Sequence, residues 1–421
     1  MKKSLFLSYC AASLLSCAPV ALLHAQVTDP RTTAQQSGSD HANNDISGGI
    51  NNGLNKTESA IKGIFKKKSK TAKADSTKTA AASAAGTSAT GSAASTESGA
   101  ADVTVSLKTY ANYDFVPGEQ VVFEDGFTDD QDGEFPAHWK LDAGQGVVNK
   151  VNGQPAFFLT EGNYVRVAPR MKTEDNYLPD NFTIEFDFYP TPGTYAPTLL
   201  FSTNDNGSRN IFFGTEVGSG YFPHDFSGQY PGDHAFFEGK WHHAAMIRKG
   251  NQIKCYLDQY RVMVMPDCGS CKVTKVEVGG IGSLEHPIVF RNFRLAEGGN
   301  MNMIGQKFTA AKIVTHGINF DVDKSTIRPE SMGTLNVIVK VMTTNPDLKF
   351  EVDGHTDNSG NAPHNLQLSQ QRADAVKAQL VAMGIDVSRL STRGLGDTKP
   401  ISDNSTQEGR ANNRRVEFVK M

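Results

Sequence analysis

A long segment near the N-terminus cannot form a globular core, and it confines folding to the rest of the chain. Residues 26–101 contain only seven large apolar side chains. Between residues 79 and 100, every residue except Glu97 is Ala, Ser, Thr or Gly. Such a composition buries too little apolar surface to offset the entropy lost on ordering. We therefore predict that residues 26–101 are a disordered linker and that the folded domains follow it.

Part of this linker is strongly basic. Residues 51–78 contain eight Lys against two acidic residues, a net charge of +6. Apolar residues nearby fall near one helical face, which would suit an interfacial helix on an anionic surface. Gly48, Gly49 and Gly53 oppose a stable helix and favour a solvated basic linker.

The first 25 residues have the pattern of an export signal. Lys2 and Lys3 precede an apolar stretch, and Ala25 supplies the small residue before a cleavage site. A second cleavage is open, because residues 14–17 read Leu-Leu-Ser-Cys and resemble a bacterial lipobox, which would place a lipid on Cys17. We expect residues 1–25 to be a signal peptide cleaved after Ala25, with lipidation of Cys17 as the alternative.

Length and charge limit the remaining possibilities. A chain of 421 residues is long enough for two or three domains. The net charge of -3 argues against a nucleic-acid-binding protein that relies on an overall basic surface. We therefore expect no nucleic-acid partner.

The middle of the chain, residues 102–300, has the pattern of an antiparallel β domain. Apolar and polar residues alternate over residues 182–188, which predicts a strand with one buried face. Turn residues predict two hairpins, one around Asn152-Gly153 and one around Gly250. Many short strands with regular turns predict an all-β sandwich.

Three stretches of this region resemble the concanavalin-like (laminin-G-type) jelly roll: Trp241-His242-His243, residues 253–258 and residues 290–295. The resemblance implies a jelly-roll sandwich that could hold a glycan or a protein ligand. Glycanases of this fold carry a strand reading Glu-x-Asp-x-(x)-Glu, whose outer Glu residues are catalytic. Here Glu185 and Asp187 are present but the last carboxylate is missing. Polar side chains on one face of the strand are therefore the simpler interpretation.

Three cysteines follow the signal peptide: Cys255, Cys268 and Cys271. In an exported chain they can form one disulfide and leave one thiol. The spacing of Cys268 and Cys271 also occurs in redox motifs, but no thioredoxin-like pattern surrounds it, so a structural bridge is favoured. The acidic residues between Asp129 and Glu134 could surround a calcium ion or form a solvated loop. We predict no metal and no cofactor.

The last part of the chain has an α+β pattern. Residues 313–320 and 349–353 read as strands, residues 415–419 as a final strand, and two helices are predicted, one starting at Pro329 and one over residues 366–383. Asp357 lies between a strand and the second helix, and Arg372 lies on that helix. A carboxylate and a guanidinium held apart suit a zwitterionic ligand such as an amino acid. The alternative is that the two side chains simply pair with each other or with neighbours.

Several motifs, in order, resemble the OmpA-like peptidoglycan-binding domain of outer-membrane anchors, peptidoglycan-associated lipoproteins and flagellar stators. They cover residues 318–321, 354–360, 365–373, 394–400 and 409–417. The resemblance implies an OmpA-like domain over residues 306–421 and ligand binding, rather than mutual pairing, by Asp357 and Arg372. The ligand would be the diaminopimelate of the peptide stem. The pocket residues implied are Asp357, Arg372, Thr356, Asn365, Asp321 and Arg414.

Together these observations predict a multidomain chain: an all-β jelly-roll sandwich followed by an α+β OmpA-like domain, after a signal peptide and a linker. We expect a non-catalytic anchor on the periplasmic face of the outer membrane, held peripherally or by a lipid, with peptidoglycan as partner. The alternative is a glycan-binding or glycan-hydrolysing envelope protein that acts through the sandwich.

Overall fold

The computed structural model describes residues 109–110, 113–204, 207–269, 272–299 and 310–421, all within the unit Lys78–Met421. The predicted signal peptide and linker lie outside these residues, as do Cys17 and Cys271. Among the described residues, no helix is both long enough and apolar enough to cross a membrane.

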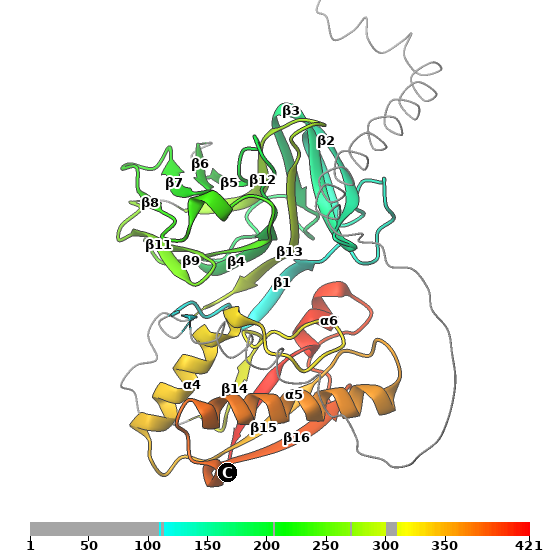
Figure 1. The fold of residues 1–421 in the computed structure, drawn as a ribbon, viewed down its shortest axis with the longest axis vertical. Helices are drawn as coiled ribbons and strands as arrows, with labels where there is room; N and C mark the ends of the chain where they lie inside the picture. The colour runs from blue at the N-terminus through cyan, green and yellow to red at the C-terminus, as the bar shows by residue number, and fades with distance from the viewer. Residues whose placement is uncertain (1–108, 111–112, 205–206, 270–271, 300–309) are drawn as a thin grey trace, which may run out of the picture. The chain divides into compact units, whose positions relative to one another are not determined.

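Residues 120–297 are β-rich, and thirteen antiparallel strands of the described residues form one hydrogen-bonded sheet (Figure 1). Both predicted hairpins are confirmed. The β2–β3 turn holds Asn152 and Gly153 at positive φ, and Gly250 does the same between β9 and β10. The jelly-roll connectivity stays a prediction. The strands are β1 (Gln120–Asp125), β2 (Trp139–Val151), β3 (Gln154–Pro169), β4 (Asn181–Phe188), β5 (Thr198–Thr203), β6 (Ser208–Phe212), β7 (Glu216–Gly220), β8 (Ser227–Gln229), β9 (His242–Lys249), β10 (Gln252–Leu257), β11 (Tyr260–Met265), β12 (Val273–Gly282) and β13 (Ile288–Glu297).

Aromatic side chains from distant strands build the core of this region. Trp139 of β2 is fully buried, and its ring centroid lies 5.8 Å from that of Phe157 and 5.4 Å from that of Phe290. The Trp139 indole N–H donates to the buried carboxylate of Asp125, 2.9 Å away. The core thus contains a polar group with a partner, as burial requires.

Strand β4 differs from the prediction of one buried face. The polar residues Thr183, Glu185 and Asp187 alternate with apolar ones as expected, yet they are also buried, with Glu185 and Asp187 only 4% and 3% exposed. Their face is covered because the Gly118 N–H donates to Thr183 Oγ1 at 2.9 Å and Arg328 lies 3.3 Å from Asp187. The alternation identified the strand, but residues distant in sequence hide its polar face.

The C-terminal region is α+β, with a four-stranded sheet in the order β14-β17-β15-β16. Strands β15 and β16 are parallel, and β17 is antiparallel to both β14 and β15. Helix α5 packs on β15 and β16. The elements are β14 (Lys312–Thr315), α4 (Met332–Thr344), β15 (Phe350–His355), α5 (Ala362–Ala382), β16 (Leu390–Gly396), α6 (Gln407–Asn413) and β17 (Val416–Lys420), with short 3₁₀ turns at His234–Phe236, Pro329–Ser331 and Val387–Arg389.

Several predicted boundaries need correction. The first strand ends at Thr315 because the chain turns there, and Phe320 makes only an isolated bridge to Ile327. Pro329 opens a 3₁₀ turn, and α4 starts after it. Helix α5 begins at Ala362, four residues before its predicted start. There the Asn361 side chain accepts from the His364 N–H and Pro363 occupies the first turn. Strand β16 and helix α6 were not predicted.

The β-rich region and the C-terminal region share buried contacts. Gly333 of α4 lies so close to the segment before β1 that a Cβ there would be 1.7 Å from the Phe115 carbonyl oxygen. Asn336 of α4 donates to the Tyr113 carbonyl oxygen, 3.0 Å away. Helix α6 packs beside β1, where the Asn412 side chain exchanges two hydrogen bonds with the backbone of Val121 (Figure 1).

Candidate functional site

Asp357 lies in the loop between β15 and α5 and is 8% exposed. One carboxylate oxygen accepts from the Ser359 N–H at 2.8 Å, and the other accepts from Arg414 Nη1 at 2.6 Å. Burial opposes ionisation, but the hydrogen bonds from Arg414 and Ser359 outweigh it and hold the pKa of Asp357 below its ordinary value. Asp357 is therefore a carboxylate at neutral pH.

Arg372 projects from α5 and does not pair with Asp357. Its Nε donates to the Lys324 carbonyl oxygen at 3.0 Å, and Nη2 lies 3.5 Å from the Asp321 carbonyl oxygen. Its guanidinium carbon is 5.0 Å from the centroid of the Phe320 ring. Burial, and then Arg414, lower the pKa of Arg372, but a guanidinium stays charged. Within the described residues, Arg372 makes hydrogen bonds only to neutral carbonyl oxygens.

Two other buried residues of the predicted pocket, Asn365 and Thr356, differ in their hydrogen bonding. Asn365 donates to the carbonyl oxygens of Asp357 and Ser359, at 3.3 and 3.0 Å, and so holds the loop in shape. Thr356 is 6% exposed, and its hydroxyl has no hydrogen-bond partner among the described residues. A buried hydroxyl without a partner costs free energy and is available to a ligand.

Glycines allow α5 to approach the sheet so closely. A Cβ on Gly354 of β15 would lie 2.3 Å from the Ser369 carbonyl oxygen of α5. The Ser369 hydroxyl in turn accepts from the Gly396 N–H at 2.9 Å. Because β15 and α5 are this close, the loop that carries Asp357 is held against the helix that carries Arg372.

Two predicted pocket residues have other roles here. The Asp321 side chain is 44% exposed and lies 3.8 Å from Lys324 Nζ, and it is the backbone carbonyl oxygen of Asp321, not its carboxylate, that lies near Arg372. Arg414 is the counter-ion of Asp357 and also pairs with Glu124 of β1. Glu124 could not be predicted as part of the site, because it is far from the domain's motifs and carries no motif of its own. The six residues remain a prediction as a ligand set.

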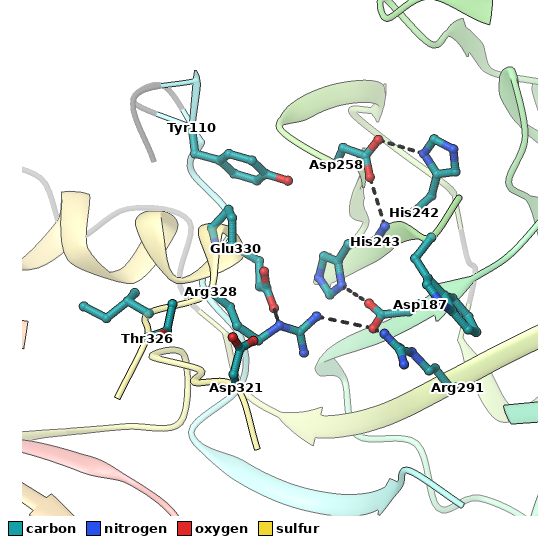
Figure 2. A pocket seen from close by; sticks show the side chains of 13 residues that line it. Tyr110, Asp187, His242, His243, Asp258, Arg291, Asp321, Thr326, Arg328 and Glu330 are labelled. Carbon is teal, nitrogen blue, oxygen red and sulfur yellow. Dashed lines mark hydrogen bonds and ion pairs between the residues drawn. The ribbon is translucent and has the colours of Figure 1, made fainter. Parts of the chain in front are cut away.

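A second charged cluster lines a pocket of about 320 Å³ where the β-rich region meets residues 321–330 (Figure 2). His243 Nδ1 lies 2.9 Å from Asp187, and Arg328 bridges Asp187 at 3.3 Å and Glu330 at 2.8 Å. Arg291 adds a third cation 3.5 Å from Asp187. We call these five residues the junction cluster; each of its charges has an opposite charge beside it.

The junction cluster offers no general base in His243. Burial disfavours its charged form, but the hydrogen bond with Asp187 and the nearby carboxylate of Glu185 outweigh burial and raise the pKa of His243 to about 10. The imidazole is therefore protonated at neutral pH, and it cannot accept a proton. Asp187 and Glu185, the two carboxylates whose strand was compared with that of glycanases, are engaged in ion pairs.

The acidic residues between Asp129 and Glu134, which could surround a calcium ion or form a solvated loop, are only partly brought together. Asp129 and Asp130 lie near Asp125 and His138, with ligand atoms within 4.8 Å of one another. Asp132 instead pairs with Lys150 at 2.7 Å. Both oxygens of Asp125 already accept hydrogen bonds, from the Phe127 N–H and from Trp139.

The cysteines agree with one bridge and one thiol. Cys268 is disulfide-bonded, and Cys255 is a free thiol buried in β10. Burial raises the pKa of Cys255, so the thiol is not a reactive thiolate.

Comparison with known proteins finds a family near the C-terminus and relatives that each match about a quarter of the chain. The model of the OmpA family matches residues 319–414. The "Probable lipoprotein YiaD" of Escherichia coli is 43% identical over 104 residues, which are 25% of this chain and 48% of that protein. The "Peptidoglycan-binding protein ArfA" of Mycobacterium tuberculosis is 41% identical over 26% of this chain and 34% of its own length.

Among solved structures, the cell wall anchor of the T6SS from Pseudomonas aeruginosa is 30% identical, with a TM-score of 0.24 over 26% of this chain and 80% of that one. The chain spans less than half the length of either curated relative. The ordered motifs and the matching residues agree on the same stretch. Residues 319–414 of this chain are therefore an OmpA domain.

Proposed function

We propose that this chain is a non-catalytic peptidoglycan-binding protein of the Gram-negative cell envelope. In this proposal residues 306–421 bind the diaminopimelate residue of the peptide stem. The OmpA domain supports the proposal, and so does the similarity to a mycobacterial protein named for peptidoglycan binding.

The observation that carries the proposal is the separation of Asp357 and Arg372. They have opposite charges and they do not pair with each other. Within the peptide stem, diaminopimelate keeps a free ammonium and carboxylate on the amino-acid end that is not part of the peptide chain. Asp357 accepts the ammonium, and Arg372 exchanges its weak carbonyl contacts for a bidentate carboxylate contact, which is stronger because both partners are charged.

Thr356 and Asn365 complete the recognition. The Thr356 hydroxyl gains the hydrogen bond that it lacks, and Asn365 keeps the Asp357 loop in place. The role is binding alone, because recognition of this kind needs no nucleophile with a neighbouring base. The chain thus holds the cell wall through its C-terminal domain.

The anchoring role depends on the location of the part of the chain that precedes the C-terminal domain. We place the preceding part of the chain at the periplasmic face of the outer membrane, held there peripherally or by a lipid on Cys17. Mass spectrometry of the mature N-terminus tests this: a lipid on Cys17 or a free N-terminus at Gln26 both fit export, whereas an uncleaved Met1 contradicts it.

Pull-down by purified sacculi tests the proposed site. We expect Asp357→Ala and Arg372→Ala each to abolish sedimentation with sacculi, because each removes one of the two charges that the ligand needs. Circular dichroism checks that both variants remain folded.

Matched controls remove the same charges elsewhere. Lys377→Ala removes a positive charge from the same helix as Arg372. Asp347→Asn removes a negative charge from an exposed side chain. Both should sediment with sacculi like the unaltered protein. If Asp357→Ala and Arg372→Ala sediment equally well, the assigned pocket is wrong.

A further inference from the structure

Arg414 divides its guanidinium between two carboxylates from different regions of the molecule. Nη1 donates to Asp357 at 2.6 Å, and Nη2 pairs with Glu124 of β1. Arg414 itself belongs to the OmpA domain, directly after α6, whereas Glu124 belongs to the β-rich region. Glu124 lies outside the OmpA domain, but it is linked to Asp357 through Arg414, which contacts both carboxylates.

The position of Glu124 is fixed from both sides. Its second oxygen accepts from Arg294 Nε of β13 at 2.7 Å. Burial disfavours the charged form of Glu124, but Arg294 and Arg414 outweigh burial and lower its pKa to about 2. The backbone of Val121, three residues earlier on β1, is bonded twice to Asn412 of α6. Strand β1 thus holds both the side chain and the helix that place Arg414.

This arrangement affects the carboxylate that would receive a ligand ammonium. A cation bound to Asp357 must share that carboxylate with Arg414. While Glu124 is charged, the positive charge of Arg414 is balanced by two carboxylates, so Arg414 neutralises Asp357 only in part. If Glu124 were neutral, Asp357 alone would balance Arg414, and their tighter pair would attract an approaching ammonium less.

We propose that Glu124 is a positioning residue of the ligand site: by holding Arg414, it keeps the Asp357 carboxylate available to an ammonium group. This inference rests on the proposed function, since it concerns the same pocket. It assigns the β-rich region a part in ligand binding that the OmpA domain alone does not have.

Calorimetric titration of the full chain with meso-diaminopimelate tests this. Glu124→Gln keeps the shape and removes the charge, and we expect it to weaken binding roughly fivefold, equivalent to about 1 kcal/mol. Glu119→Gln removes a charge from the exposed residue just before the same strand and should leave the affinity unchanged. Glu124→Asp keeps the charge on a shorter side chain and should bind with intermediate affinity.

The decisive measurement is the same substitution in an Arg414→Gln background. Because Glu124 acts through Arg414, Glu124→Gln should have no further effect there, whereas a direct or merely structural effect of Glu124 would persist. If Glu124→Gln destabilises the chain too far to titrate, Glu124→Asp alone and in the Arg414→Gln background replaces it.

The two proposals fail differently. If the unaltered chain binds meso-diaminopimelate and the Glu124 variants bind equally well, the positioning role is wrong and the proposed function stands. An undiminished loss in the Arg414→Gln background also overturns the positioning role. If the unaltered chain does not bind the amino acid at all, both proposals fall.

Discussion

The junction cluster and the proposed ligand site around Asp357 and Arg372 are both groups of charged side chains, but their charges are compensated differently. In the junction cluster, Asp187 is surrounded by His243, Arg291 and Arg328, and Arg328 also pairs with Glu330 (Figure 2). At the proposed ligand site, Asp357 is paired with Arg414, but Arg372 donates only to carbonyl oxygens and lies against the Phe320 ring, and the Thr356 hydroxyl has no hydrogen-bond partner within the described residues.

The difference shows which buried polar groups can serve a ligand. A charge that is paired with an opposite charge inside the protein holds elements together, and a ligand has to displace or share that pair to reach it, as an ammonium would share Asp357 with Arg414. A guanidinium with neutral partners, or a hydroxyl with none, gains free energy when a ligand supplies the missing partner. Substitutions in the junction cluster should therefore change stability, and substitutions in the pocket should change binding.

Asp187→Asn should give the largest loss of stability. It leaves three cations without their common carboxylate, and breaking a buried ion pair from one side costs about 3–5 kcal/mol. Denaturant unfolding of the full chain measures this free energy. The exposed Asp347→Asn is the control and should change it by less than about 0.5 kcal/mol.

The same variant tests the comparison directly. In protein that remains folded, Asp187→Asn should bind sacculi like the unaltered chain. A loss of sacculus binding by folded Asp187→Asn would show that the junction cluster also serves the ligand.

Gly333→Ala should have the next largest effect. Its Cβ would meet the Phe115 carbonyl oxygen at 1.7 Å, so α4 must shift from the segment before β1, and such overpacking costs about 1–3 kcal/mol. Thermal unfolding measures the loss. Gly126→Ala adds the same methyl group at ordinary contact distance, 3.4 Å from Asn292, and should be nearly neutral. Equal stability of the two variants would mean that α4 does not depend on this contact.

Much of the fold could be predicted because its signals are local. The alternation over residues 182–188 and the turn at Asn152-Gly153 identified strands and a hairpin that the structure contains. Strand β16 was missed because its sequence, LSTRGLG, is polar and Gly-rich, and α6 was missed because it is only seven residues long. Both elements depend on packing against neighbours rather than on their own pattern.

The candidate site was predicted only as far as its motifs extend. Asp357 and Asn365 were identified by their motifs, and in the structure the Asn365 side chain donates to the Asp357 carbonyl oxygen. The burial of Asp187 and the contact of Glu124 with Arg414 could not be predicted, because each joins residues more than 140 positions apart. No periodicity or spacing in one sequence records such a contact.

Alkaline pH should lower the stability that the junction cluster provides, because His243 loses its charge. Because the pKa of His243 is raised above its unfolded value, its stabilising charge is fully present below about pH 6.5 and is lost as the pH rises toward about 10. The free energy of unfolding should therefore fall over that interval. His243→Gln should flatten this decrease, as measured by unfolding at several pH values. An unchanged slope in His243→Gln would assign the decrease to other groups. Arg372, a guanidinium, should add no slope there.

Thr356→Val should have the smallest effect on stability, and in an unusual direction. The Thr356 hydroxyl is buried without a partner, so replacing it with a methyl group of similar size removes an unsatisfied group and should stabilise the chain by up to about 1 kcal/mol. The same variant should bind meso-diaminopimelate more weakly, since the ligand loses a hydrogen bond. Unfolding and titration of one preparation measure both. A loss of stability with unchanged affinity would place Thr356 with the compensated groups of the junction cluster and remove it from the pocket.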